Sequence, residues 1–553
     1  MATTGHASPN ADTVAFTAQS EPTVLSYFEA FSSRPSWREL ARWPPDVFAL
    51  TNLILDHTEA YRFTVAPPRG ARWPPRGDWN ERVQRAADEW RVTAANPQRS
   101  PPSDVVKLWR VVLERRDTPL SVLRRGEDCP LLRALLTLHA IADEACRGLA
   151  SSQPAPAASF ERAAWDLLSA RGSLAHIEPT RVRITPKTQL ASRGITIRSL
   201  SRYLALNYES IDVHWRRIDP LPDRPERTKR DYNILLVPWP LQVTDSAFRP
   251  VEGPLENMDP GTFGFFQYDP DESLDVRLLR TLVEQAQQRV KRIDTVITPE
   301  ASIRAEEIPA LEMLMTELGV LSVIAGVRQS PRRGKLGRNY VHLGVRTGEG
   351  WTTFEQEKHH RWCLDQTQIR QYHLSHALDP SRQWWEAIDL PARTVEIIDL
   401  GGGATVAPLV CEDLARMDEV SDLLRRIGPT LVVALLLDGP QLPQRWPCRY
   451  AAVLADEPGS AVLTLSAFGM VARSRPSGKP RSRVVAMWSD PMSGPQHIEL
   501  GRGASGILLT ASAEAKTVWT ADGRRHDTTP SLTLRNVEQM RVKRSPSQRR
   551  QVA

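Results

Sequence analysis

Three side chains that could do chemistry together follow apolar segments of this sequence. They are Glu300 in residues 298–300 (TPE), Lys358 in residues 357–359 (EKH) and Cys411 in residues 410–413 (VCED). A free thiol has a pKa of ~8.5 and is only slightly ionised at neutral pH, so it needs a base nearby. A carboxylate can take the thiol proton, and an ammonium group can stabilise the oxyanion that forms next. The three residue types therefore fit covalent hydrolysis of a carbon–nitrogen bond.

The elements that must position these groups alternate between strands and helices from residue 232 onward. Apolar runs predict strands at 234–238, 295–298, 321–326, 340–345, 395–400, 405–410, 430–437, 461–465, 483–488 and 507–510. Helical spacing predicts helices at 274–290, 305–318, 417–427 and 447–456. Strands that are apolar on both faces and alternate with helices indicate a layered α/β domain. Folds of this class place their chemistry at strand ends, which is where the three motifs lie.

The first 230 residues follow a different pattern. Residues 1–25 are small and polar, and we expect them to be loose. Residues 26–230 are expected to be mainly α-helical and of unknown role, because apolar residues recur there at spacings of three and four between proline-rich joints. The charged, proline-rich run at 216–230 marks the boundary, so the α/β domain is placed at 231–525. Residues 526–553 are locally basic and are predicted to form a solvated tail.

The composition indicates a globular protein with substantial cores. Of 553 residues, 41% are hydrophobic and 25% are charged. The 71 basic and 65 acidic residues leave a net charge of +6, which is mild for this length and does not by itself indicate nucleic-acid binding. The five cysteines form no CxxC pair, which fits reduced thiols. Because the sequence has neither a long apolar run nor a signal-like start, it predicts a cytoplasmic protein without a membrane span.

The three motifs resemble, in order and spacing, those of the carbon–nitrogen hydrolase (nitrilase) superfamily. The resemblance extends over residues 232–523 and rests on residues 297–302, 357–360 and 408–413. It implies that Glu300 is the general base, that Lys358 stabilises the oxyanion and that Cys411 is the nucleophile. It also implies that the backbone N–H of Glu412 shares the oxyanion with the lysine.

The same resemblance implies a fold and a reaction. The fold would be a C-terminal four-layer α-β-β-α sandwich, preceded by the mainly helical region, and two copies would pair through the C-terminal domain as a homodimer. The thiolate would attack a small amide or carbamoyl-type substrate, an amine or ammonia would leave, and water would release the acid. Neither a metal nor an organic cofactor is implied.

One departure from the family pattern concerns a second carboxylate. Members usually carry a further glutamate about seven residues beyond the lysine, and here Asp365 is the nearest acid. A shorter acid could serve if its loop comes closer to the site. We further expect His359 and Trp362 to line the substrate pocket, together with Asp438, which follows the predicted strand at 430–437.

Other interpretations stay open at this stage. Imidazole and thiolate side chains, which zinc prefers, gather in one segment, although their spacing matches no closed zinc motif: His359, His360, Cys363, His373 and His376. A different class of function is a sensor or scaffold that kept the fold but lost efficient turnover. Its N-terminal helices would then bind a protein or nucleic-acid partner in a multi-component intracellular system such as bacterial defence.

Nucleic-acid binding by the chain itself is the weakest interpretation. It would use the basic patch near Arg198 and the basic C-terminal tail. No helix-turn-helix or zinc-finger motif accompanies them, so we expect no nucleic-acid partner.

Overall fold

The computed structural model describes most of the chain. The described residues are 21–31, 37–75, 77–150, 159–190, 194–208, 211–218, 230–251, 258–331, 335–400, 404–416, 420–474 and 481–542. The predictions for residues 1–20, for the boundary run at 219–229 and for the end of the tail at 543–553 lie outside this part of the chain.

Contacts divide the chain into two compact units. The first comprises Met1–Ser210, Leu423–Gly428 and Ala515–Thr529, and the second comprises Ile211–Asp422, Pro429–Glu514 and Pro530–Ala553. No described helix is long and apolar enough to cross a bilayer.

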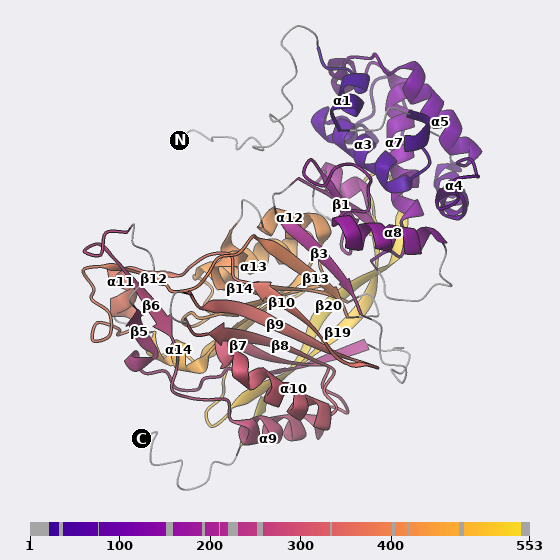
Figure 1. Ribbon diagram of the computed structural model, residues 1–553. Helices are drawn as coiled ribbons and strands as arrows, with labels where there is room; N and C mark the ends of the chain where they lie inside the picture. Colours follow the sequence, from indigo (N-terminus) through magenta and orange to yellow (C-terminus); the bar gives the residue numbers. More distant parts are fainter. Residues whose placement is uncertain are drawn as a thin grey trace. The chain divides into compact units, whose positions relative to one another are not determined.

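The first unit contains a group of helices around one apolar helix, α7 (Cys129–Ala145). The other helices are α1 (Val24–Phe31), α2 (Trp37–Leu40), α3 (Pro44–His57), α4 (Trp79–Ala94), α5 (Ser103–Glu114), α6 (Leu120–Arg125) and α8 (Ser159–Arg171). Asp128 caps α7 by accepting the Leu131 N–H, and most of the helix is buried against α3, α4 and α5 (Figure 1). The stretch expected to be mainly helical also contains β1 (Arg183–Pro186), which pairs with β2 (Leu204–Asn207).

A buried charged network closes this unit at the end of α7. Asp143 accepts backbone N–H groups from Arg202, Tyr203 and Leu204 at 2.8 to 2.9 Å. The Arg524 guanidinium, also buried, donates to the same carboxylate at 2.9 Å. Since a buried charge is tolerated only when it is paired and hydrogen-bonded, these contacts explain how Asp143 can sit in the core.

The second unit contains two seven-stranded sheets and a smaller four-stranded one. The first sheet has the strand order β10-β9-β8-β7-β4-β19-β20, and the second has the order β18-β17-β16-β15-β14-β13-β3. The strands of the first are β4 (Arg230–Leu236), β7 (Thr295–Arg304), β8 (Ser322–Gln329), β9 (Arg338–Thr347), β10 (Gly350–Glu357), β19 (Gly506–Trp519) and β20 (Arg525–Met540). Those of the second are β3 (Asp212–Arg217), β13 (Thr394–Asp399), β14 (Thr405–Val410), β15 (Leu431–Leu436), β16 (Ala461–Ser466), β17 (Val484–Asp490) and β18 (Gly494–Glu499).

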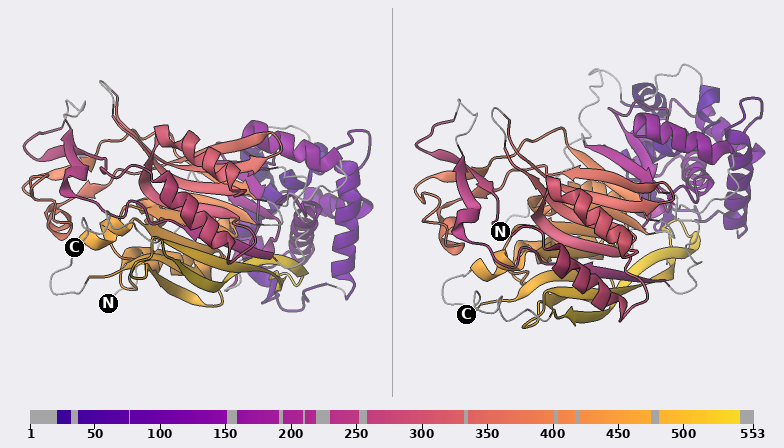
Figure 2. Two further views of the ribbon diagram at one scale, coloured as in Figure 1. Left: turned by 90° about the horizontal axis from the view of Figure 1, so that it is seen from below. Right: turned by 60° about the horizontal axis from the view of Figure 1, so that its bottom comes forward.

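The two large sheets face each other, and helices lie against them. Strand β7 contacts β15 and β16, and β14 contacts β9 and β10. Helices α9 (Val276–Gln287) and α10 (Ile308–Glu317) lie next to each other along the first sheet (Figures 1 and 2), and α13 (Trp446–Asp456) packs on β16, β17 and β18. The unit is therefore mixed α/β, as expected, and its core lies between the sheets.

The four-stranded sheet has the order β11-β12-β6-β5 and carries an aromatic cluster. Its strands are β5 (Phe248–Val251), β6 (Phe263–Tyr268), β11 (Cys363–Leu364) and β12 (Gln383–Glu386). The remaining described helices of the unit are α11 (Gln366–Gln371) and α14 (Phe468–Arg473), and α12 (Val420–Ile427) begins in this unit and continues into the first.

The stretch from residue 526, expected to be a basic tail, begins as a strand. Residues up to Met540 belong to β20, which pairs with β19 at the edge of the first sheet. Leu532 and Leu534 are buried, and this alternation outweighs the local charge.

Candidate active site

Lys358 lies between two buried glutamates. Its Nζ donates to Glu300 Oε1 at 2.7 Å and to Glu386 Oε2 at 2.6 Å, and all three side chains are almost fully buried. Asn339 completes the group, because its Nδ2 donates to Glu300 Oε1 at 2.8 Å and to Glu386 Oε1 at 2.7 Å. The lysine directly follows β10 and the asparagine lies on β9, so one hairpin positions both donors.

An irregularity within β7 between Thr298 and Ile303, the glutamate turn, presents Glu300 to this group. Ala301, the next residue, has a φ of 50°. The Arg328 Nη1 donates to the Ala301 carbonyl at 2.8 Å, and Gly326 on β8 lies so close that a Cβ there would come within 2.5 Å of the Glu300 Cα. The missing side chain at Gly326 therefore gives the glutamate turn its space.

Cys411 lies on a second strained turn, at the end of β14. Its φ is 47°, a left-handed conformation that non-glycine residues adopt rarely and that clusters at functional sites. The thiol is buried. On the neighbouring strand end, the Leu437 N–H donates to Glu300 Oε2 at 2.5 Å. Burial and Glu300 raise the pKa of the Cys411 thiol, and the same N–H partly opposes them. The carboxylate and the thiol therefore lie around one backbone N–H.

Burial and neighbouring charges shift the pKa values of Glu300, Lys358 and Cys411. Burial and the charge of Glu300 raise the pKa of Cys411 well above its ordinary value, and Lys358 opposes them. Burial and the charge of Glu386 raise the pKa of Glu300, and the charge of Lys358 opposes them. Burial alone would lower the pKa of Lys358, but the two glutamates raise it well above its ordinary value, so the amine is held as ammonium.

Asp413 ties the lysine segment to the turn that carries Cys411. Its carboxylate is buried and accepts the His359 backbone N–H at 3.1 Å and the His360 Nδ1–H at 2.9 Å. Because Asp413 is two residues from Cys411, these bonds fix the segment that carries Lys358 relative to the thiol.

The carboxylate that contacts Lys358 besides Glu300 is Glu386, not Asp365. Asp365 is exposed and caps α11, where its side chain accepts the Gln368 N–H at 2.7 Å. The sequence predicted Asp365 as the second carboxylate of the site, and Glu386 takes that position instead. Asp365 precedes a helix, where an aspartate is a strong N-cap. Glu386 comes 28 residues after the lysine, on β12.

The other expected site residues lie near the lysine and the thiol in different roles. His359 is buried, and its Nε2 lies 2.8 Å from the Thr394 carbonyl, so its ring is held in the interior. Trp362 is half-buried, and its backbone N–H donates to Glu386 Oε2 at 3.2 Å. Asp438 is buried just after β15. The Glu412 side chain points to a surface ion pair with Arg416 at 2.8 Å, which leaves only its backbone for the site.

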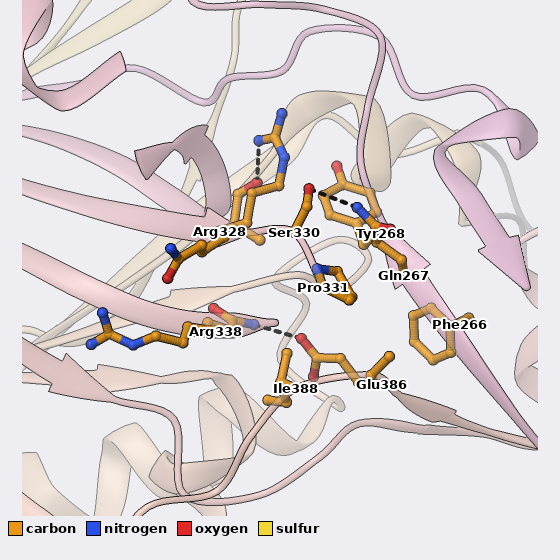
Figure 3. A pocket seen from close by; sticks show the side chains of 13 residues that line it. Phe266, Gln267, Tyr268, Arg328, Ser330, Pro331, Arg338, Glu386 and Ile388 are labelled. Atoms are coloured by element: carbon orange, nitrogen blue, oxygen red, sulfur yellow. Dashed lines mark hydrogen bonds between the residues drawn. The ribbon is translucent and has the colours of Figure 1, made fainter. Parts of the chain in front are cut away.

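A small cavity adjoins the glutamate cluster (Figure 3). Asn339, Glu386 and Ala301 line it together with Arg328 and Tyr268. Its other lining residues are Phe266, Gln267, Gln329, Ser330, Pro331, Arg338, Ala387 and Ile388. Cys411 is not among the lining residues, so this cavity reaches the carboxylate side of the cluster and not the thiol.

Comparison with known proteins places these observations in context. No protein-family model matches the chain, and no curated protein sequence matches it. The chain is similar to the crystal structure of Saccharomyces cerevisiae Nit3, a member of branch 10 of the nitrilase superfamily, at 13% identity and a TM-score of 0.32, covering 51% of this chain and 90% of that one. It is also similar to the glutamine-dependent NAD+ synthetase from Acinetobacter baumannii (13% identity, TM-score 0.30, 57% of this chain and 48% of that one).

A third solved structure is the C. elegans NitFhit protein, with 13% identity and a TM-score of 0.32 over 48% of this chain and 57% of that one. Of these three structures, the first is described as a member of the nitrilase superfamily.

Two residues of the site, Glu386 and Asn339, were not predicted from the sequence. Glu386 had a signal, because it alternates with the buried Trp384 along β12 and so shares its inward face. Asn339 had none, since a single asparagine at the start of an apolar strand is unremarkable. Among the described residues, no three His, Cys, Asp or Glu side chains are grouped as a metal site, which leaves the zinc interpretation without a ligand set.

Proposed function

We propose that this protein is a thiol-dependent hydrolase of a non-peptide carbon–nitrogen bond, acting on a small amide or carbamoyl-type substrate. The facing sheets with their outer helices fit the four-layer α-β-β-α sandwich that this chemistry would occupy. One observation carries the proposal: Lys358 is held between Glu300 and Glu386 beside a thiol on a strained turn.

The first half of the reaction forms a thioester. Glu300 takes the proton of Cys411, and the sulfur attacks the carbonyl carbon of the substrate. The ammonium of Lys358 and the backbone N–H of Glu412 stabilise the oxyanion. When the oxyanion collapses, the carbon–nitrogen bond breaks, and the amine leaves with the proton that Glu300 held.

The second half restores the enzyme. Glu300 removes a proton from water, and the resulting hydroxide attacks the thioester carbon. The carbon–sulfur bond then breaks, the acid leaves, and the thiolate regains the proton. Because burial raises the pKa of Glu300, the carboxyl is a better proton acceptor than an exposed glutamate would be.

Glu386 and Asn339 keep the lysine in position in this scheme, the first directly and the second through the two glutamates. The second carboxylate fixes the Nζ in place and keeps it charged, while Asn339 donates to both glutamates. Since an oxyanion group must be oriented before the reaction begins, these contacts support catalysis without touching the substrate.

Incubation of the intact protein with a library of small amides, followed by mass spectrometry, tests the proposal. We expect an acyl adduct on Cys411 and release of the acid. Cys411→Ala should abolish both, whereas Cys448→Ala, which removes a buried thiol on α13, should retain them. Turnover of the same amides by Cys411→Ala at the wild-type rate would falsify the proposal.

A second candidate function is a weakly active sensor or scaffold, favoured by the high pKa of Cys411. Burial and Glu300 keep the resting thiol protonated, so turnover could be slow. In that case the helical unit would carry the biology by binding a partner. Iodoacetamide labelling separates the candidates: preferential labelling of Cys411 over the other four cysteines supports the hydrolase, and uniform labelling supports the sensor.

A further inference from the structure

Asp438 has one buried carboxylate oxygen that no donor reaches among the residues that the structure describes. The residue is 7% exposed. Its Oδ1 accepts the Gly439 N–H at 2.7 Å, the Arg445 Nη2–H at 2.6 Å and the Tyr372 hydroxyl. Its Oδ2 accepts none. An uncompensated buried carboxylate oxygen is costly, and such an atom in a folded protein calls for an explanation.

This oxygen belongs to a residue beside the thiol. Val410 pairs with Leu435 in the parallel register of β14 and β15, so Cys411 and Asp438 both follow neighbouring strands at the same sheet edge. The Leu437 N–H, one residue away, binds Glu300. The negative charge of Asp438 also raises the pKa of Cys411, after burial and Glu300, which is consistent with this closeness.

Aromatic rings connect the glutamate cluster with Asp438. The rings of Trp362 and Tyr372 meet edge to face, with centroids 5.7 Å apart. The backbone N–H of Trp362 donates to Glu386, and the Tyr372 hydroxyl donates to Asp438.

The charges of the site indicate the kind of ligand that would pair with Asp438 Oδ2. Lys358 pairs with both Glu300 and Glu386, and Arg445 pairs with Asp438, so these three carboxylates share two cations among the described residues. A buried group with this excess of negative charge gains stability from one further cation.

We propose that Asp438 Oδ2 binds a protonated amine of the substrate, so that the preferred substrates are amides carrying an ammonium group a few bonds from the scissile carbonyl. This inference rests on the proposed function and specifies its substrate class. It has a consequence for the chemistry: a bound ammonium offsets the charge of Asp438 and thereby lowers the pKa of Cys411. The substrate would then help to ionise the nucleophile that attacks it.

Two matched alkylating reagents test the inference without requiring turnover. N-(2-aminoethyl)chloroacetamide carries a cation, and N-(2-hydroxyethyl)chloroacetamide is its neutral counterpart. With either reagent the sulfur of Cys411 displaces chloride, a carbon–sulfur bond replaces the carbon–chlorine bond, and the thiol proton passes to Glu300 and then to water. Peptide mass spectrometry of the full-length protein measures the rate at Cys411.

Asp438→Asn removes the charge and keeps an oxygen that can accept from Tyr372, Gly439 and Arg445. Asp389→Asn is the matched control, because it removes an exposed aspartate of the same unit. The wild-type protein should react about tenfold faster with the cationic reagent than with the neutral one. Asp438→Asn should reduce this ratio to about that of free cysteine, and Asp389→Asn should leave it unchanged.

The outcomes separate the inference from the proposed function. A reactive Cys411 that shows no cationic preference in the wild-type protein overturns the inference and leaves the hydrolase standing. The same holds if Asp438→Asn, folded by its thermal unfolding curve, keeps the preference. A Cys411 that reacts no faster than the other cysteines with either reagent overturns the proposed function and the inference with it. The wild-type comparison needs no variant, so it decides even if Asp438→Asn fails to fold.

Discussion

A hydrogen bond of 2.9 Å from His360 Nδ1 to Asp413 Oδ1 joins the lysine segment to the turn that carries Cys411. Asp413 also accepts the His359 backbone N–H through its other oxygen. Both bonds are buried around one carboxylate, so they couple the positions of two catalytic candidates that lie far apart in sequence.

Asp413→Asn should therefore disturb the site more than loss of the histidine ring alone. The amide presents an N–H to one of the two donors, which leaves that donor unpaired and costs about 1.5–3 kcal/mol of unfolding free energy. We expect slower iodoacetamide labelling of Cys411 together with a lower urea midpoint. His360→Gln, which keeps a side-chain donor, should retain most of the labelling rate, and equal effects of the two variants would contradict a positioning role for Asp413.

Gly326→Ala should displace Glu300. The added Cβ would lie 2.5 Å from the Glu300 Cα and would clash with the Pro299 carbonyl oxygen, so the turn has to move. We expect the amide-hydrolysis rate to fall at least tenfold, since small misplacements of catalytic groups are costly. Gly348→Ala is the control, because nothing lies within 4 Å of its Cβ position. A fully active Gly326→Ala would show that the glutamate turn tolerates movement.

The strands that carry Glu300 and lead to Cys411 could be predicted from the sequence, because their apolar runs are continuous, whereas β10, which leads to Lys358, was not predicted. Strand β14 has the expected bounds of 405–410, and β15 lies within the expected 430–437. Such runs are typical of buried parallel strands, and the motif residues at their ends follow from them. Strands β6 and β12 were missed, since each is short and carries aromatic residues that do not alternate cleanly.

The partners of the site residues could not be predicted in the same way. Glu386 reaches Lys358 only because the four-stranded sheet brings β12 next to the end of β10, and no local pattern encodes that approach. Asp365 was the nearest acid in sequence, but its position before α11 made it a helix cap. Sequence distance therefore selected an acid that does not contact the lysine.

Comparison of Glu386→Gln with Asp365→Asn tests which carboxylate orients Lys358. The glutamine keeps the shape but removes a charge from Lys358, so we expect kcat to fall by about tenfold to a hundredfold with a smaller change in KM. Asp365→Asn keeps an N-cap residue and should leave kcat within about twofold, with stability nearly unchanged. A larger loss in Asp365→Asn than in Glu386→Gln would restore Asp365 as the orienting acid.

The first unit should lose stability in mild acid through His139. Burial lowers the pKa of this histidine from 6.5 to about 3. As the pH falls below the unfolded-state value, the unfolded chain binds a proton that the folded chain does not. The stability due to neutral His139 is therefore complete above about pH 6.5 and is lost progressively toward pH 3. At pH 5 the loss is about 2 kcal/mol.

Hydrogen–deuterium exchange of α7 peptides at pH 5 and pH 7.5 measures this effect. His139→Gln, which can still accept a hydrogen bond from Asn52, serves as the comparison. The opening free energy of α7 should fall less on acidification in the variant than in the wild-type protein, once the intrinsic exchange rates are corrected for pH. Identical pH dependence in the two proteins would contradict the assignment.

The pH profile of Cys411 alkylation should move in opposite directions when its two charged neighbours are changed. Burial and Glu300 raise the pKa of the thiol, and Lys358 lowers it. Because the thiolate is the reactive form, the wild-type rate should keep rising above the pH at which free cysteine levels off. Glu300→Gln removes a negative charge, lowers the pKa of the thiol and shifts the profile to lower pH. Lys358→Met removes the positive charge and shifts it to higher pH. Lys358→Met also leaves two buried carboxylates without their cation, so its unfolding free energy should fall by about 3–5 kcal/mol. The pH profile of labelling is measured with iodoacetamide between pH 6 and pH 10, without urea. Shifts of the same sign in both variants would mean that the two charges do not act on this sulfur.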